Sequence, residues 1–301
     1  MSQTVFDSVY KQKLLDTFNY LIGFLNNYNL RWWCAYGTII GAIRHHGLIP
    51  WDDDIDIWMP RCDYERLLLL HDELFEDSHG HYGVGHITIS SDYGVRFAKV
   101  MDLTTTIQSK RFVPFISGVF VDVFPLDSSN DIIDVILAYK NQVNKAWNNY
   151  FDYVRHFSLV DIAEAGFSAR FLLNALRTNL KTNDKAKHKA LNKALEYEGA
   201  FKTNKFEGCV HSFSVFGFYN ERDIFQPQWF DGYKDVEFDG LMVRIPIGYH
   251  DLLTHIYGDY MTPPPIEKRT PRHKPYYINL KERLTLQEVA QRIKSGETLV
   301  F

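Results

Sequence analysis

Residues 51–57 read Trp-Asp-Asp-Asp-Ile-Asp-Ile, so four aspartates occur within five positions. Charged and apolar side chains alternate from Asp54 onward, which predicts a strand over residues 54–59 with one polar and one buried face. On that strand Asp54 and Asp56 point to the same side, while the isoleucines enter the core. Two neighbouring carboxylates repel each other unless a cation lies between them. The pattern therefore favours a site for Mg²⁺, which binds carboxylate oxygens together with substrate phosphates.

A solvated acidic turn and a calcium-binding loop are the alternatives for this segment. A loop of the EF-hand type needs a glycine at its sixth position and a closing glutamate, and neither is present. The aspartates alone do not decide between a solvated turn and a metal site. Asp122 favours the metal site, because it lies within Val-Phe-Val-Asp-Val-Phe (119–124), a predicted buried strand where an unpaired charge is costly.

The region before the aspartates contains a second candidate feature. The apolar run Arg-Trp-Trp-Cys-Ala (31–35) predicts a short strand, and Gly37-Thr38 follows it at the start of a predicted helix. Backbone N–H groups at a helix N-terminus bind phosphate well. This order of elements, followed by a strand with two aspartates and a strand with one, is similar to the nucleotidyltransferase superfamily, the fold of DNA polymerase β. We expect an α+β fold with a nucleotidyltransferase-like mixed sheet flanked by helices.

The rest of the chain gives further elements. Periodicity and turn signals predict helices over 7–28 and 249–256, strands over 86–90, 95–101 and 211–216, a hairpin over 233–248 turning at Asp239-Gly240, and a capping box at Thr285 and Glu288. The segment 131–205 has a helical, lysine-rich pattern. We expect residues 1–130 and 206–301 to form the catalytic domain, and 131–205 to form a helical insertion that faces the acceptor or a membrane.

Composition narrows the class of protein. With 46% hydrophobic and 23% charged residues, the 301-residue chain is typical of globular domains rather than disordered segments. A formal net charge of −4 argues against nucleic acid as a partner. The three cysteines lack the spacing of a disulfide framework or a zinc site. The N-terminus lacks a signal-peptide pattern and no apolar run approaches the length of a membrane span, so we expect a cytoplasmic protein.

Four segments together closely resemble one narrower family. They are residues 36–67, which include the aspartates, and residues 96–105, 118–127 and 252–273. These segments are similar to the signature of the LicD family, bacterial phosphocholine transferases related to fukutin and fukutin-related protein. The resemblance covers about residues 15–127 and 233–273, and the segment 131–230 carries no motif that we can assign.

The resemblance implies a reaction and its partners. It implies metal-dependent transfer of phosphocholine from CDP-choline to a hydroxyl of a glycan or lipid-linked glycan (lipopolysaccharide, teichoic acid or capsule), with release of CMP. Transfer of ribitol phosphate or glycerol phosphate is the alternative, and a non-catalytic nucleotide- or glycan-binding protein of the same fold is the second alternative. The expected location is the cytoplasm. Peripheral contact at the inner membrane face is an expectation from the lysine-rich helical pattern rather than from the resemblance, and a solvated helix face is the alternative.

The resemblance and the residue types together give an expected division of roles. We expect Asp54, Asp56 and Asp122 to be catalytic and to bind Mg²⁺, or Mn²⁺, against the donor diphosphate. Asp122 could also, or instead, accept the proton of the acceptor hydroxyl. Arg44 and Lys99 are the expected cationic partners of the diphosphate, and an ion pair with the aspartates is the alternative for both.

The remaining candidates would contact substrate. A quaternary ammonium is bound by aromatic faces, so some of the 46 aromatic side chains could surround choline, although core packing explains most of them. The aromatic candidates are Trp51, Trp58 and Tyr64. The polar candidates are Gly37, Thr38, Asp52 and His273. His46 and His273 could also serve the catalytic base or the acceptor, and a structural or exposed histidine is the alternative for both.

Overall fold

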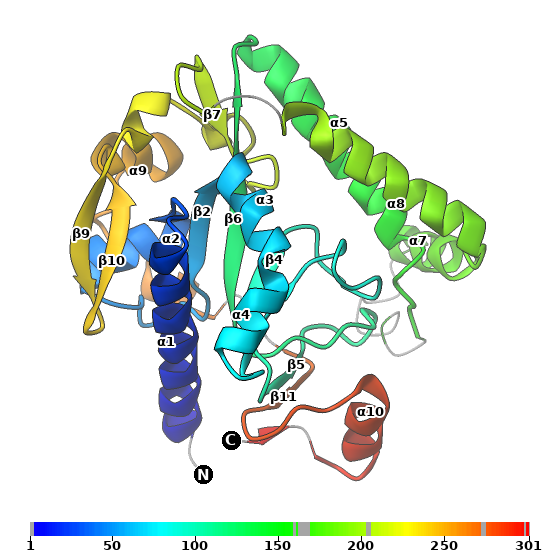
Figure 1. Ribbon diagram of the computed structural model, residues 1–301. Coiled ribbons are helices and arrows are strands. Elements are labelled where there is room, and N and C mark those ends of the chain that lie inside the picture. Colours follow the sequence, from blue (N-terminus) through cyan, green and yellow to red (C-terminus); the bar gives the residue numbers. More distant parts are fainter. Residues whose placement is uncertain are drawn as a thin grey trace.

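A mixed sheet carries the strands predicted around the aspartates (Figure 1). In the computed structural model, which describes residues 3–158, 161, 169–202, 206–271, 275–297 and 299–300, its main path runs in the order β1, β2, β6, β4, β3. The strands are β1 (Trp33–Cys34), β2 (Asp56–Pro60), β3 (Tyr82–Gly85), β4 (Ala98–Asp102) and β6 (Phe120–Ser129). β2 and β6 are parallel, and the other neighbours are antiparallel. The α+β prediction is therefore confirmed.

The sheet extends beyond this path, and two smaller sheets accompany it. The far end of β6 pairs with β7 (His211–Phe213), which pairs in turn with β8 (Ile224–Phe225). The predicted hairpin is formed by β9 (Tyr233–Phe238) and β10 (Leu241–Pro246). Its turn residues Asp239 and Gly240 have φ values of 48° and 83°, as a two-residue hairpin turn requires. The third sheet contains β5 (Thr106–Gln108), β11 (Tyr277–Asn279) and β12 (Leu299–Val300).

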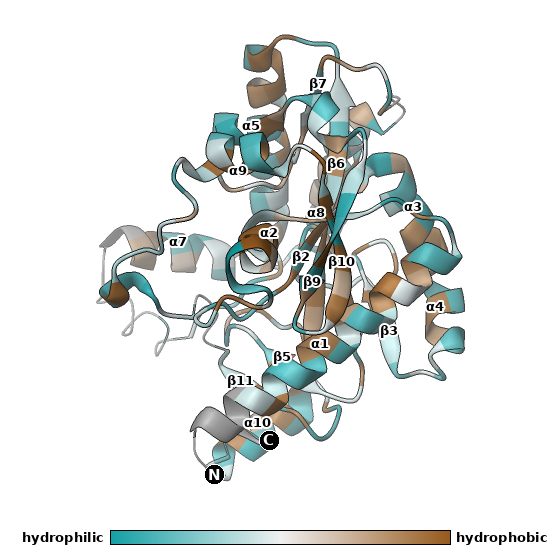
Figure 2. Ribbon diagram, turned by 90° about the vertical axis from the view of Figure 1, so that its left-hand side faces the viewer, coloured by the Kyte–Doolittle hydropathy of each residue, from teal (hydrophilic) through white to brown (hydrophobic). Residues whose placement is uncertain are grey.

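The helices before β6 pack on the main sheet. They are α1 (Gln3–Asn27), α2 (Tyr36–Ile40), the π-helix η1 (Gly41–His45), α3 (Arg61–Leu69) and α4 (His71–Asp77). The helix predicted over 7–28 is confirmed by α1, and its apolar side chains Leu14, Phe18, Leu21 and Leu25 are completely buried. α1 contacts β4 and β6, and α3 contacts β2 and β6. Figure 2 shows that hydrophobic residues gather on the central strands that these helices cover.

Helices also dominate the described part of residues 131–205. They are α5 (Ile133–Phe151), α7 (Ala169–Asn179), α8 (Asp184–Glu198) and the 3-10 turn η2 (Gly199–Phe201). α5 and α8 lie side by side along one flank of the molecule (Figure 1). The division of the chain into a catalytic domain and an insertion stays a prediction.

The later helices complete the fold. They are the short 3-10 helices η3 (Asn220–Asp223), η4 (Pro227–Phe230) and η5 (Ile266–Lys268), and the α-helices α9 (Tyr249–Tyr257) and α10 (Leu286–Lys294). The predicted capping box of α10 is present, with Thr285 and Glu288 exchanging hydrogen bonds. Among the described helices, none is both long enough and apolar enough to cross a membrane.

The strand predicted over 86–90 is wrong. This segment folds into turns, in which the amides of Ile89 and Ser90 both donate to the carbonyl of His86. The His86 ring is buried and its Nδ1 accepts the amide of Thr88. The alternating pattern does not form a strand here, because the buried His86 ring hydrogen-bonds to the backbone that follows it and stabilises the turns. The neighbouring strand β3 lies at Tyr82–Gly85 instead.

Candidate functional site

Three strands bring three of the predicted charged side chains into one row. Asp56 on β2 lies opposite Asp122 on β6, and Asp122 lies opposite Lys99 on β4. Residues directly opposite each other on neighbouring strands point to the same face of a sheet. Lys99 Nζ donates a hydrogen bond to Asp122 Oδ1, and both side chains are buried. Lys99 therefore forms an ion pair with one of the aspartates, which was the alternative to a direct contact with the diphosphate.

Asp54 joins this row from the loop before β2. Because the strand begins at Asp56, the predicted strand 54–59 is two residues too long at its start, and neither Asp54 nor Asp52 lies on it. The loop nevertheless brings one carboxylate oxygen from each of Asp54, Asp56 and Asp122 within 4.8 Å of one another. A second such group is formed by Asp52, Asp53 and Asp54.

The electrostatics of the row suit a cation. The pKa of the Asp56 carboxyl is raised well above its usual value, first by burial and then by the neighbouring aspartates, and Lys99 acts in the opposite direction. Carboxylates that destabilise one another in this way are stabilised by a shared cation. Three oxygen donors on a partly buried surface match the ligands that Mg²⁺ prefers. The residues present therefore fit a divalent metal ion.

The Gly37-Thr38 pair supports the aspartate loop. Both residues lie in the first turn of α2, and the Thr38 amide donates to the carbonyl of Ala35 at 3.0 Å, so this amide is not directed to a phosphate. The Thr38 hydroxyl accepts the amide of Asp56 at 2.9 Å and fixes the start of β2. A Cβ at Gly37 would lie 2.8 Å from a carboxylate oxygen of Asp52, so a larger residue would displace that side chain.

Tyr10 is a contact that the sequence pattern does not reveal. Its hydroxyl donates to the backbone carbonyl of Asp53 at 3.0 Å, from helix α1 to a loop 43 residues later. The pKa of Tyr10 is raised, first by burial and then by the charges of Asp53, Asp54 and Asp122. Tyr10 therefore lies within electrostatic reach of the aspartates and holds the loop that carries them.

Positive charge gathers around Trp51, directly before the aspartates. The guanidinium carbon of Arg44 lies 6.0 Å from the Trp51 ring centre and that of Arg269 lies 4.9 Å from it. The pKa of Arg44 is lowered by burial and by Arg269, and the pKa of His45 is lowered by burial and by both arginines. The sequence pattern did not identify Arg269 as a candidate, although Arg269 lies in the same family-like segment as His273. Mutually repelling cations of this kind favour an anionic ligand.

Two of the aromatic candidates belong to the core. Trp58 is completely buried, and its ring packs against Tyr36, Phe225 and Phe230. Tyr64 is completely buried too, and its hydroxyl accepts the amide of Ala98. Neither ring offers a free face to choline, so the structure does not support these two as direct substrate contacts. Both residues have the alternative role, packing in the hydrophobic core.

Three neighbouring tyrosines, two of which are in electrostatic contact with Asp56, were not predicted. The rings of Tyr36 and Tyr219 have centres 5.9 Å apart, and those of Tyr219 and Tyr257 have centres 5.3 Å apart. Burial raises the pKa of both Tyr36 and Tyr257, and the charge of Asp56 contributes to each shift. Tyr219 and Tyr257 are only half-buried. We call Tyr36, Tyr219 and Tyr257 the tyrosine cluster.

The two histidine candidates have different outcomes. His46 ends η1 with a φ of 54°, and its carbonyl accepts the amide of Asp239 from the hairpin turn. This contact gives His46 a structural role. His273 lies outside the described residues, so its role stays a prediction.

Comparisons with known proteins agree with one another. Residues 29–171 match the family model described as LicD/FKTN/FKRP, nucleotidyltransferase domain. The chain is 28% identical over 265 residues to lipopolysaccharide cholinephosphotransferase LicD of Haemophilus influenzae. The aligned residues cover 86% of this chain and 92% of that protein. Human ribitol 5-phosphate transferase FKRP is 41% identical over 44 residues, which are 15% of this chain and 9% of that protein.

Proposed function

Because residues 29–171 form a LicD-family domain, we propose that this protein is a transferase that moves phosphocholine from CDP-choline to a glycan hydroxyl and releases CMP. Lipopolysaccharide is the first acceptor to test, because the name of the Haemophilus relative specifies it. Teichoic acid and capsule are the further acceptors. The proposal includes the nucleotidyltransferase type of fold for the sheet that carries the site.

The observation that carries the proposal is the meeting of Asp54, Asp56 and Asp122 within 4.8 Å. Mg²⁺, with Mn²⁺ as the alternative, would be held by these three carboxylates and would supply positive charge to the diphosphate and the leaving CMP. An intact set of three acidic donors argues against a non-catalytic binding protein. Thr38 and Tyr10 support the set, because they fix the backbone on either side of Asp54.

The surrounding side chains then have distinct tasks. Lys99 orients the Asp122 carboxylate through its hydrogen bond, which favours a positioning role for Lys99 over direct contact with the diphosphate. Asp122 is the proposed acceptor of the proton from the attacking hydroxyl. Arg44 and Arg269 are the proposed partners of the donor's phosphate oxygens, since guanidinium groups form directed hydrogen bonds with phosphate.

Tyr219 and Tyr257 of the tyrosine cluster are the proposed wall for the choline group, and buried Tyr36 packs behind Tyr219. A quaternary ammonium cannot donate hydrogen bonds and is held by the faces of aromatic rings. Tyr219 and Tyr257 keep part of their surface exposed, and Tyr257 lies within electrostatic reach of Asp56. The local similarity to a ribitol 5-phosphate transferase keeps CDP-ribitol as the second candidate donor.

The test is release of CMP by the purified protein with Mg²⁺, CDP-choline and deacylated lipopolysaccharide. We expect Asp54→Asn and Asp56→Asn each to reduce turnover at least 100-fold, in line with the loss of a metal-ligand carboxylate. Asp72→Asn is the matched control, since its side chain is 81% exposed on α4. Full turnover in either site variant would refute the proposed metal site. Turnover with CDP-ribitol but not with CDP-choline would identify CDP-ribitol as the donor.

A further inference from the structure

Helix α7 and Leu180, whose amide donates to the carbonyl of Leu176 and so continues the last turn, present a row of leucines to solvent. Leu172, Leu173, Leu176 and Leu180 are 37%, 67%, 50% and 80% exposed. Their spacing places them within about 100° of one another around the helix axis, while the buried residues of α7, Ala175 and Thr178, lie on the other side. A surface helix normally turns its apolar stripe toward the core. We call Leu172, Leu173, Leu176 and Leu180 the leucine row.

A basic helix follows the leucine row. α7 ends at Asn179 and α8 begins at Asp184, so four residues separate the two helices. Residues 169–202 contain eight basic and three acidic side chains, a net charge of +5, in a chain whose formal charge is −4. The positive charge is therefore concentrated on this part of the surface.

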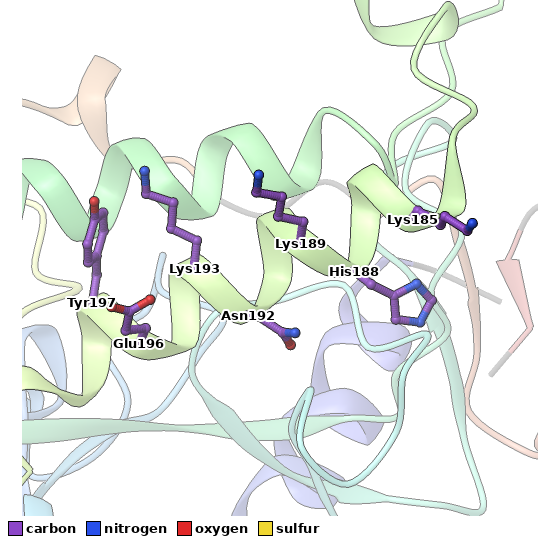
Figure 3. A pocket seen from close by; sticks show the side chains of 7 residues that line it. All are labelled: Lys185, His188, Lys189, Asn192, Lys193, Glu196 and Tyr197. Carbon is purple, nitrogen blue, oxygen red and sulfur yellow. The ribbon is translucent and has the colours of Figure 1, made fainter.

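The lysines of α8 border an open hollow (Figure 3). Lys185, Lys189 and Lys193 line it, and Lys189 and Lys193 project to the same side of the helix. All three lysines are exposed. The hollow is open and is lined by one helix, so it suits contact with an extended anionic surface better than enclosure of a small ligand.

Exposed leucines and a cluster of exposed lysines, here on consecutive helices of the chain, are the two features of a segment that lies on an anionic membrane. The apolar side chains enter the boundary between headgroups and acyl chains, and the basic side chains stay with the lipid phosphates. We propose that the leucine row and Lys185, Lys189 and Lys193 dock this protein on the surface of an anionic lipid bilayer. The proposal does not depend on the transferase function, because neither helix supplies a residue of the aspartate site.

The experiment is co-sedimentation of the full chain with vesicles. We expect binding to vesicles that contain 30% phosphatidylglycerol in phosphatidylcholine, little binding to pure phosphatidylcholine, and weaker binding as the salt concentration rises. Leu173→Asp/Leu176→Asp should lower the partition constant at least tenfold. Lys185→Gln/Lys189→Gln/Lys193→Gln should lower it about 100-fold, at roughly 1 kcal/mol for each basic residue.

Matched variants at other exposed positions provide the controls. Leu69→Asp/Ile266→Asp removes two apolar side chains that are more exposed than Leu173 and Leu176, and Lys110→Gln/Lys234→Gln/Lys281→Gln removes the same charge. Both controls should bind vesicles like the unaltered protein, and thermal melting should show that all four variants fold. Equal binding to neutral vesicles, or equal losses in the control variants, would overturn the proposal. A dimer in sedimentation velocity that Leu173→Asp/Leu176→Asp dissolves would assign the leucine row to self-association instead.

Discussion

Replacing Lys99 by methionine tests the charge balance of the aspartate site. Lys99 and Asp122 each have 8% of their side chain exposed, so the ion pair is almost completely removed from water. The Lys99 ammonium also lies 3.2 Å from the centre of the Phe120 ring. Methionine keeps the unbranched apolar part of the side chain, but it removes the ammonium and with it the positive charge next to Asp122 and over the Phe120 ring.

The expected effect follows from the burial of the pair. Removing one partner of a buried ion pair costs about 3–5 kcal/mol, because the remaining charge is poorly solvated. We expect Lys99→Met to lower the free energy of unfolding by about 3 kcal/mol in EDTA, since half-buried Asp56 gives water access to the site. Mg²⁺ at 100 times its Kd should return about 2.7 kcal/mol, if the ion binds only the folded protein.

Urea unfolding followed by tryptophan fluorescence measures these differences. The double variant Lys99→Met/Asp122→Asn should recover at least half of the loss in EDTA, because both charges of the pair are then absent. Lys281→Met, at an exposed lysine, should stay within about 0.5 kcal/mol of the unaltered protein. If Lys99→Met is as stable as this control, or if the double variant recovers nothing, the ion pair does not have the role that its burial implies.

Three further outcomes are expected. Thr38→Val should lower the free energy of unfolding by about 1–3 kcal/mol in urea, because a strand amide loses its acceptor, whereas Thr38→Ser should not. Tyr257→Ala should raise KM for CDP-choline more than for CDP-ribitol in the CMP assay, and equal effects would exclude the ring as a choline contact. Burial, with Lys202 and Arg61 nearby, lowers the pKa of His86 to about 3, so the unfolded chain takes up its proton first as the pH falls below about 6.5. Stability should then decrease toward pH 4 by up to about 1.4 kcal/mol per pH unit, and His86→Gln should flatten that part of the profile.

Local sequence patterns predicted the two strands that carry Asp56 and Asp122. Alternation around Asp56 and the apolar context of Asp122 identify two buried strands, and their pairing brings the two carboxylates together. The hairpin turn at Asp239-Gly240 was predictable because left-handed φ values favour these residue types. The same reasoning failed at His86, where a side-chain hydrogen bond to the backbone outweighs the alternating pattern.

The residues that surround and position the aspartates could not be predicted from local sequence patterns. Tyr10 contacts a loop 43 residues away, and Arg269 meets Arg44 across more than 200 positions. Neither residue differs in sequence context from an ordinary surface tyrosine or arginine. The position of Asp54 has the same origin, because distant contacts, rather than the strand period, set the shape of its loop. These side chains become visible only when the fold brings separate segments together.

The order of the strands also determines when the site can exist during synthesis. A nascent chain that has emerged through β4 already contains Asp54, Asp56 and Lys99, but β2 and β4 are not neighbours in the finished sheet. Only β6, made later, enters between them and supplies Asp122. The three aspartates therefore come together only after β6 has been made, and a ribosome-bound fragment that ends before residue 120 cannot form the group of three carboxylates. Assembly of the aspartate row thus marks the point at which the main sheet has received its central strand.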